Sequence, residues 1–349
     1  MNADIALILG ADGLAGSAVY LIAGLGLVLI FSVTRVIFVP FGDIAVFAAL
    51  SLGAMEMGRL PAAIMLIGLF AVIALIMELV ELRRDRAWRR LPATLLIWGL
   101  APLLACALAG WATSHGPEGL RVIAAVLLAV PLGPLINRVA LQPIAHASVL
   151  TLLIAALVLH FLLSGLGLLW FGPEGIRTKA SLDGAWVLSE GFSINHQVLL
   201  TIAAAFLLAA AFYVGFERTR LGKVLRATAS NRTGARLVGI RPRHTALVAH
   251  TVAALLAGIV GVLISPVTTI YYDSGLMLGL KAFVAAIIGG LISYPLTALG
   301  AVAVGLVESF ASFWSGGLKE VIVFGLLIPV LILRSGLTTH ADEAEEDEV

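Results

Sequence analysis

The sequence predicts an all-α bundle of membrane-spanning helices, and two observations support this fold class. Hydrophobic residues make up 60% of the 349 positions and charged residues 12%, whereas a soluble domain is roughly 45–50% apolar and about 25% charged. The apolar excess extends over almost the whole chain, in runs that approach the ~17–25 residues a helix needs to cross a bilayer. A single soluble core cannot bury so much apolar surface, so the sequence indicates a polytopic membrane protein.

Eleven apolar runs are expected to be spans, and the second, ninth and eleventh of them are short. The runs cover residues 14–34, 41–57, 61–82, 91–113, 120–137, 148–170, 196–216, 246–271, 277–292, 295–313 and 319–334.

The distribution of Lys and Arg predicts how these spans are oriented. The linker 83–90 contains five arginines, and the stretch 217–245 contains eight basic residues against one acid, Glu217. Short basic loops stay in the cytoplasm, so both segments are placed inside. Alternating spans then put the N-terminus outside and the C-terminus inside, which requires an odd number of spans and agrees with eleven.

Two further segments are expected to be more than connectors. Residues 171–195 form a polar outside loop with room for a short strand or an interfacial helix. The last ten residues contain six acids, and such charge without apolar anchors is typical of disorder. We therefore expect a transmembrane domain over 1–339 followed by a disordered acidic tail over 340–349.

Motifs for enzymatic chemistry are missing from the sequence. No stretch matches the phosphate-cradling G-x-x-x-x-G-K-[ST] pattern, and the seven histidines lack zinc-ligand spacing. His160 and His250 lie inside apolar runs, where we expect each to form a hydrogen bond with a neighbouring helix. Glu78 and Glu81 border the arginine linker and are expected to pair with its first two arginines. The chain is therefore expected to be non-catalytic, without a metal or nucleic acid, and to act in transport, as a channel or as a scaffold.

The loop 217–245 contains apolar residues that a purely topological loop does not need. Leu221, Val224 and Leu225 are spaced for one helical face, and a second apolar cluster follows at 237–240. Two short amphipathic helices in a cytoplasmic loop suit docking into a groove on another protein. The alternative is a basic loop that only fixes topology.

The ends of the two short helices are marked in the sequence. Asn231 is placed to cap the second helix, and Gly239 is placed to end it. This loop resembles the cytoplasmic loop of LivH-type permeases, the membrane subunits of branched-chain amino-acid ABC importers. The matching residues are Gly222, Lys223, Arg226, Ala227, Asn231, Ala235, Leu237, Gly239 and Ile240.

Two other motifs resemble the same family. Gly42-Asp43 follows Val36-Ile37 as in the early motif of the family, and the resemblance extends over 14–57 and 137–337. Residues 279–308 match its late motif at Gly279, Lys281, Ala282, Phe283, Gly289, Gly290, Pro295, Gly300, Gly305 and Glu308.

The resemblance implies a permease subunit of an ATP-binding-cassette importer in the bacterial inner membrane, surrounded by lipid. It implies a dimer with a second copy or a sister permease, two cytoplasmic ATPase subunits and a periplasmic substrate-binding protein. No cofactor would bind to this chain, and ATP would be used by the partner subunits. An ion-coupled secondary transporter of small organic acids is the alternative, and it would not require the docking loop. The residues expected to couple to the ATPases are Gly222, Leu225, Arg226, Asn231, Leu237 and Gly239.

The sequence departs from the family pattern in three places, of which one is the turn Leu141-Gln142-Pro143-Ile144 after Arg138, without the usual Tyr and second Arg. Residues 75–113 form a surplus of about two helices relative to the usual arrangement, and an even insertion preserves the downstream topology. Phe38 and Phe41 stand where the early motif usually has Asn and His. An aromatic-lined passage would favour a carboxylated solute with an apolar or aromatic body, branched-chain amino acids included.

Paired interrupted helices in two halves of a chain often mark a transporter binding site. Residues 42–53 can be laid over 279–290 at a constant offset of 237 with five identities in twelve positions, and helix breakers precede both segments. The alternative is close packing of helices through small residues. The residues expected along the substrate pathway are Phe38, Phe41, Gly42, Asp43, Gly279, Lys281 and Phe283.

Ionisable residues inside spans face a partner or a water-filled path. Lys281 and Glu308 are expected to form either a structural ion pair or part of the pathway. Asp43 and Glu56 lie near opposite ends of a short run, where snorkelling to the interface explains both.

Overall fold

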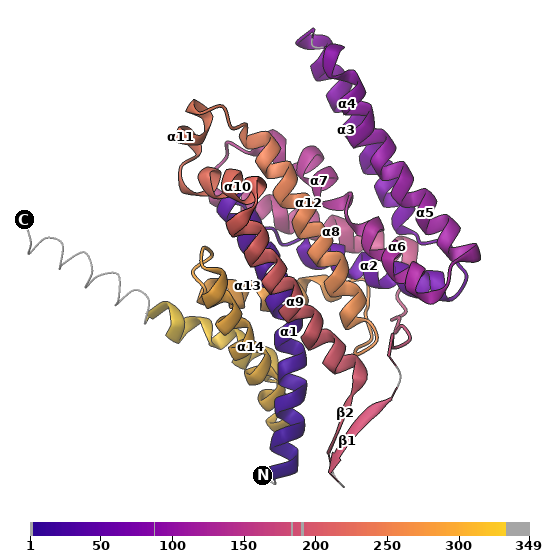
Figure 1. Ribbon diagram of the computed structural model, residues 1–349, viewed down its shortest axis with the longest axis vertical. Coiled ribbons are helices and arrows are strands. Elements are labelled where there is room, and N and C mark those ends of the chain that lie inside the picture. The colour runs from indigo at the N-terminus through magenta and orange to yellow at the C-terminus, as the bar shows by residue number, and fades with distance from the viewer. Residues whose placement is uncertain (1–2, 87, 183, 190–191, 333–349) are drawn as a thin grey trace, which may run out of the picture.

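The computed structural model describes residues 3–86, 88–182, 184–189 and 192–332, and these form a helical bundle with one β-hairpin (Figure 1). The chain is an all-α polytopic membrane protein. The predicted tail 340–349 and the end of the last predicted span lie outside the described residues. The α-helices are α1 Ala3–Thr34, α2 Phe41–Glu56, α3 Ala63–Arg84, α4 Leu91–Leu95, α5 Ala101–His115, α6 Glu118–Ala129, α7 Leu132–Ile136, α8 Val149–Phe171, α9 His196–Arg218, α10 Arg220–Ser230, α11 Arg232–Leu237, α12 Pro242–Ile264, α13 Ser274–Ile288, α14 Tyr294–Trp314 and α15 Lys319–Gly325. The remaining elements are the 3-10 turns η1 Trp88–Arg90 and η4 Gln142–Ile144, the π-helical turns η2 Leu96–Leu100 and η3 Asn137–Leu141, and the strands β1 Ala185–Ser189 and β2 Phe192–Asn195.

Each of the eleven predicted runs contains helix, but in the described part of the chain eight helical segments are long and apolar enough to cross a membrane. The eleven spans are therefore not confirmed. The three runs that fall below this length are the three that are short in the sequence, now seen as α2, α13 and α15 with 16, 15 and 7 residues. Helices α2 and α13 are too short to span alone at about 1.5 Å per residue.

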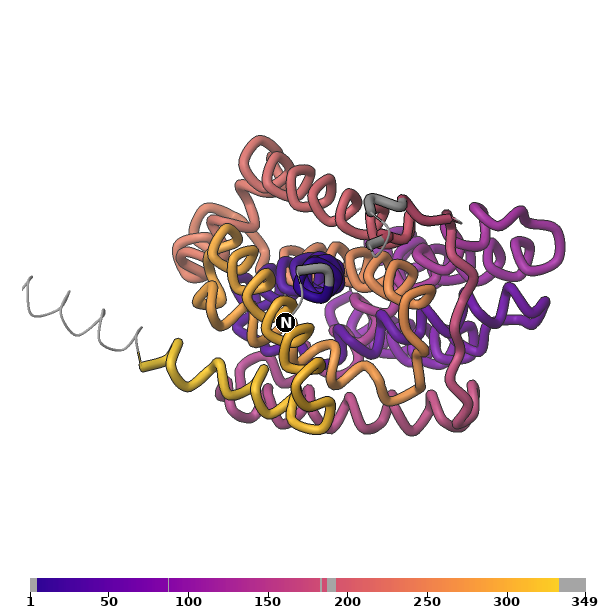
Figure 2. Tube along the Cα trace, turned by 90° about the horizontal axis from the view of Figure 1, so that it is seen from below, coloured from indigo at the N-terminus to yellow at the C-terminus, as the bar shows by residue number. Residues whose placement is uncertain are grey.

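Helix α1 occupies the centre of the bundle. It packs against α9, α12, α13 and α14, and Figure 2 shows it end-on with other helices around it. Helix α2 is also enclosed, because nearly all of its residues are buried. By contrast, the run 88–115 and α9 lie at the periphery and turn large apolar side chains such as Leu103 and Phe206 outward. In a bilayer these outward faces meet lipid, so the peripheral helices are apolar all round and need no amphipathic periodicity.

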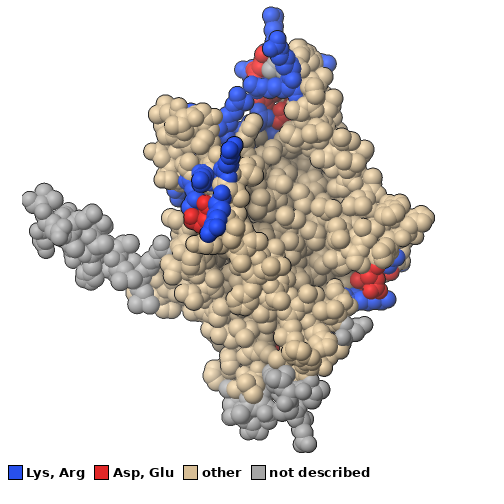
Figure 3. All heavy atoms as spheres, in the orientation of Figure 1, with Lys and Arg blue, Asp and Glu red and all other residues tan. Residues whose placement is uncertain are grey.

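The two ends of the molecule differ in the segments that they carry. The N-terminus and the β-hairpin lie at one end in Figure 1, whereas α10, α11 and the tip of the α3–α4 hairpin lie at the other. Figure 3 shows Lys and Arg gathered at this second end. The loops predicted to share the cytoplasmic side thus share one end. Of the short strand and the interfacial helix considered for 171–195, the structure has strands, since β1 pairs antiparallel with β2 and Ala185 lies opposite Asn195.

The segment predicted as a two-helix surplus does not consist of two complete helices. Residues 75–84 are the second half of α3, and residues 88–113 belong to the broken run η1–α4–η2–α5. Together α3 and this run form a hairpin, which we call the peripheral hairpin (63–115). Its two arms pack on each other, and α5 also packs on α6.

Candidate functional site

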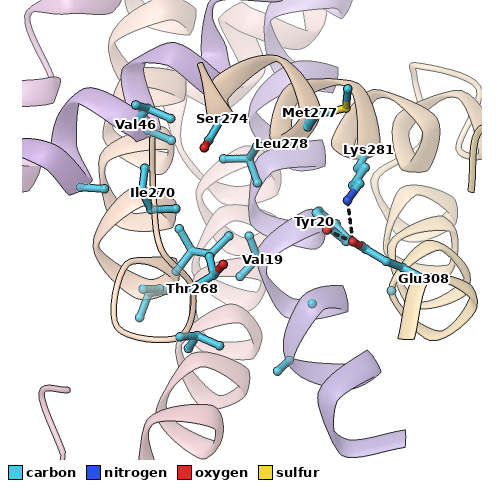
Figure 4. Close-up of a pocket in the computed structure, with 18 of the residues that line it drawn as sticks. Val19, Tyr20, Val46, Thr268, Ile270, Ser274, Met277, Leu278, Lys281 and Glu308 are labelled. Atoms are coloured by element: carbon cyan, nitrogen blue, oxygen red, sulfur yellow. Dashed lines mark hydrogen bonds and ion pairs between the residues drawn. The ribbon is translucent and has the colours of Figure 1, made fainter. Parts of the chain in front are cut away.

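A cavity of about 960 Å³ lies among α1, α2, α8, α9, α13 and α14 and the connection that precedes α13 (Figure 4). Its volume is in the range of roughly 300–1,000 Å³ that is typical of small-molecule sites. Most of the lining is apolar, and Figure 4 shows Val19, Ile270 and Leu278 in it. The polar side chains that reach it include Asp12, Tyr20, His160, Lys281 and Glu308.

Lys281 and Glu308 form an ion pair at the edge of this cavity. The Lys281 ammonium donates to Glu308 Oε1 at 2.5 Å, and the Tyr20 hydroxyl donates to Glu308 Oε2 at 2.5 Å. A second carboxylate, that of Glu320 on α15, lies 3.8 Å from the Lys281 Nζ. Helices α1, α13, α14 and α15 therefore meet at one charge cluster. The expected ion pair of Lys281 is confirmed; Lys281 also lines the cavity, and its role in a pathway stays a prediction.

Asp43 is not at an interface, so the expected snorkelling is wrong for this residue. Asp43 as a whole is 1% exposed, and its carboxylate oxygens lie 2.8 and 3.0 Å from His160 Nδ1 on α8. Because α2 is enclosed by the bundle, Asp43 has no route to water and needs an internal partner. His160 thus bonds a neighbouring helix as expected, and it also lines the cavity. His250 instead bonds the Ala246 carbonyl of its own helix at 2.8 Å, against the expectation.

Helices α2 and α13 approach each other through glycine. A Cβ built on Gly42 would lie 1.9 Å from the Gly275 carbonyl oxygen, and one on Gly279 would lie 3.3 Å from the Val39 carbonyl oxygen. The close packing predicted from small residues is therefore confirmed. The two short segments that can be laid over each other in the sequence are the two short helices that touch here. Their role in a pathway stays a prediction.

The three phenylalanines predicted along the pathway do not line the cavity. Phe38 packs edge-on against the His250 ring at 5.0 Å between centroids, and the Phe41 ring fills the space beside Gly26. Phe283 is partly buried against the same core. The interpretation of an aromatic-lined passage is therefore wrong for this cavity, whose walls are mainly aliphatic.

The loop 217–245 folds into the two helices α10 and α11, and the second begins and ends as predicted. The Asn231 side-chain oxygen accepts from the Gly234 N–H at 2.8 Å, which caps α11, and Gly239 has φ +88°, which ends it. Such a positive φ favours glycine. Arg226 donates to Glu217 at 2.7 Å and so ties α10 to the end of α9.

The two apolar clusters of this loop have different environments. Leu225 is 4% exposed and packs with Leu29 and Phe216 of its own chain. Its expected contact with a partner protein is therefore wrong, because α10 folds back onto the ends of α1 and α9. Gly222 allows this fold, since a Cβ there would lie 2.2 Å from the Phe216 carbonyl oxygen. Leu237, by contrast, is 85% exposed.

Glu78 and Glu81 pair with residues far away in the sequence and not with the first two arginines of the linker, Arg83 and Arg84. Arg138 lies 2.7 Å from a carboxylate oxygen of each acid, and Arg243 also pairs with both. Glu78 and Arg138 are buried. We call these four residues the ion cluster; it joins α3, η3 and the start of α12.

The sequence reasoning missed Asp12 and Tyr20 as cavity residues. Asp12 lies in α1 and has no neighbouring charged residue in the sequence that would draw attention to it. Tyr20 is separated from its partner Glu308 by 288 positions. Neither residue belongs to a motif, so the sequence contained no signal for either. His160 carried a weak signal, as a histidine within an apolar run.

A polytopic bundle with a partly charged cavity and a folded, capped loop at its basic end is typical of membrane transporters. The family described as the permease component of branched-chain amino acid transport systems matches residues 10–331. The chain belongs to this family.

Individual relatives agree with that assignment. The chain is similar to the high-affinity branched-chain amino acid permease protein LivH of Escherichia coli (strain K12), with 30% identity over 217 residues, which cover 60% of this chain and 70% of LivH. It is equally similar to BraD of Pseudomonas aeruginosa, at 30% identity over 60% of this chain and 71% of BraD. A probable LivH of Methanocaldococcus jannaschii is 26% identical over 58% of this chain and 67% of its own length. No solved structure matches.

Proposed function

We propose that the chain is the membrane-spanning permease subunit of an ATP-binding-cassette importer in a bacterial inner membrane. Its solutes would be branched-chain amino acids or related small carboxylated molecules, as the names of its relatives suggest. The observation that carries the proposal is the loop 217–245, which is folded, capped and basic, and which also exposes the apolar side chains of Leu221, Leu237 and Val238. Nothing in the bilayer requires such a surface.

The proposed partners follow from this function. Two cytoplasmic ATPase subunits would bind and hydrolyse ATP, so this chain would bind no cofactor and catalyse no reaction. A second copy or a sister permease would complete the membrane core, and a periplasmic binding protein would deliver the solute. The end that carries the loop 217–245 would face the cytoplasm, in accordance with its arginines.

The surface of this loop defines what its partner needs. Leu221, Leu237 and Val238 are 61%, 85% and 77% exposed, which offers apolar anchors for a groove. Burial together with the positive charges of Arg236 and Arg35 lowers the pKa of Arg232. The like charges that surround Arg232 would be relieved by acidic groups on a partner. We therefore expect the ATPase groove to combine apolar and acidic residues.

The cavity beside Lys281 is the proposed passage. Lys281 is compensated by Glu308, so a solute carboxylate would have to compete with that pair for the ammonium. Such an exchange would open the contact between α13 and α14, which is the kind of change that alternating access needs.

A secondary transporter is less well supported by the same geometry. Two of the acids that could hold its coupling ion are already paired, Asp43 with His160 and Glu308 with both Lys281 and Tyr20. It would also leave the exposed apolar side chains of the loop 217–245 without a role.

The coupling role can be tested with a matched pair of variants in α11. Leu237→Asp combined with Val238→Asp removes the exposed apolar anchors, whereas Thr233→Asp adds a charge to the same short helix at an exposed polar position. We expect the double variant to insert and fold normally, to lose ATP-driven uptake and to stop co-purifying with the ATPase subunits. Thr233→Asp should keep both properties. Normal uptake by the double variant, or wild-type uptake in cells that lack the ATPases, would overturn the proposal.

A further inference from the structure

A groove of about 470 Å³ separates the peripheral hairpin from the first turns of α12. The ion cluster closes its base, where Arg243 of α12 reaches both Glu78 and Glu81 of α3. The groove and the cavity of the proposed passage share no lining residue. It is therefore a separate feature, and the transport function does not account for it.

The rim of the groove is basic. Arg90, Arg241 and His244 are exposed and line it, together with one acid, Asp85. The two acids at the base do not offset this charge, because Arg138 and Arg243 already compensate them. A rim of this kind attracts an anion.

The walls below the rim are apolar. Ile97 and Trp98 face the groove from one side, and Leu247 and Val248 line it from α12. Ile97 is 40% exposed, and it belongs to a helical run that is apolar enough to cross the bilayer. A ligand that fills this groove thus needs an apolar part beneath its charged part.

The position of the rim relative to the spans fixes its depth. Three candidate spans have one end beside the groove. These are the end of Ala63–Arg84 and the beginnings of Trp88–His115 and Pro242–Ile264. The charged rim therefore lies at the height of lipid headgroups, and the apolar walls extend toward the acyl chains. Basic pockets between transmembrane helices at this height bind anionic lipid headgroups.

We propose that the groove binds one anionic phospholipid. The headgroup phosphate lies at Arg90 and Arg241, and one acyl chain runs along Ile97, Trp98 and Leu247. The lipid fills the space between the peripheral hairpin and α12, and so steadies the point at which the loop 217–245 returns to the membrane. Free phosphate would engage the rim alone and leave the walls without a partner.

The test measures lipid binding to the full-length protein in detergent by native mass spectrometry, during titration with phosphatidylglycerol or with neutral phosphatidylcholine. The variant that probes the site is Arg90→Gln combined with Arg241→Gln. Its control, Arg83→Gln combined with Arg84→Gln, removes the same charge from exposed positions of the same hairpin outside the groove lining. Each rim arginine is worth about 1 kcal/mol toward an anionic lipid, so phosphatidylglycerol should bind roughly 25-fold more weakly to the first variant. The control should bind as the wild type does.

A second variant tests the walls without changing the charge. Val248→Trp fills the groove and should weaken phosphatidylglycerol binding, whereas an excess of inorganic phosphate should not displace the lipid. Equal binding of the two lipids, equal losses in the two double variants, displacement by inorganic phosphate, or a bound polypeptide in place of the lipid would each overturn the proposal. These outcomes do not depend on transport, so they are separate from the test of the proposed function.

Discussion

Replacing Gly42 with Ala should separate α2 from α13, and the structure gives the size of the effect. The new Cβ would lie 1.9 Å from the Gly275 carbonyl oxygen, so the two backbones would have to move apart by about 1.5 Å to reach an ordinary contact of 3.4 Å. Overpacking of this kind costs about 1–3 kcal/mol. Because α2 is enclosed on all sides and cannot shift toward lipid, we expect the upper end, about 3 kcal/mol.

Two other glycines serve as controls for this variant. A Cβ on Gly279, in the same interface, would meet the Val39 carbonyl oxygen at 3.3 Å, and Gly68 on α3 has nothing within 4 Å of its Cβ position. Gly279→Ala should therefore cost little. Gly68→Ala should gain up to about 1 kcal/mol from the better helix propensity of Ala.

The series is measured as equilibrium unfolding in mixed micelles, with solute uptake recorded in parallel. The expected order of stability is Gly68→Ala, then Gly279→Ala, then Gly42→Ala. If Gly42→Ala were as stable as Gly279→Ala, α2 and α13 would not be in backbone contact, and the reasoning about the interface would be refuted.

Two further predictions concern the buried charges. Arg138→Met should lower the free energy of unfolding by about 3 kcal/mol, because it leaves the buried Glu78 carboxylate with less compensation. Adding Glu78→Leu should restore part of that loss. Strictly additive effects of the two substitutions would contradict the pairing. Lys281→Met should reduce uptake of labelled leucine because it leaves Glu308 uncompensated beside the cavity. Adding Glu308→Gln should recover part of the uptake, whereas a further loss would show that the carboxylate acts apart from the lysine.

The sequence was sufficient for features that depend on neighbouring residues along the chain. Helix formation in each apolar run, the Asn231 cap, the end at Gly239 and the strand within 171–195 all appear in the structure. Each of these depends on a local pattern of polarity or on one residue type with special backbone chemistry. The short length of two runs also agrees with the short helices α2 and α13.

The partners of the buried charges could not be predicted in this way. Asp43 and His160 are 117 positions apart, and Arg138 reaches Glu81 across 57. Local spacing suggested snorkelling for Asp43 and pairing with the adjacent arginines for Glu81, because those alternatives are close in sequence. Which helices become neighbours is decided by packing over the whole bundle, and packing at this scale is not encoded in any one segment.

A continuous set of backbone contacts connects the loop 217–245 to the cavity, and it explains why glycines occupy these positions. The loop 217–245 runs directly into α12. A Cβ on Gly261 of α12 would lie 2.0 Å from the Ala45 carbonyl oxygen of α2. In the same way, a Cβ on Gly42 of α2 would lie 1.9 Å from the Gly275 carbonyl oxygen of α13. Contacts between bare backbones contain no side chain that could change rotamer to absorb a displacement. We therefore expect a movement of the loop to reach α13 and the ion pair of Lys281 with little loss of amplitude.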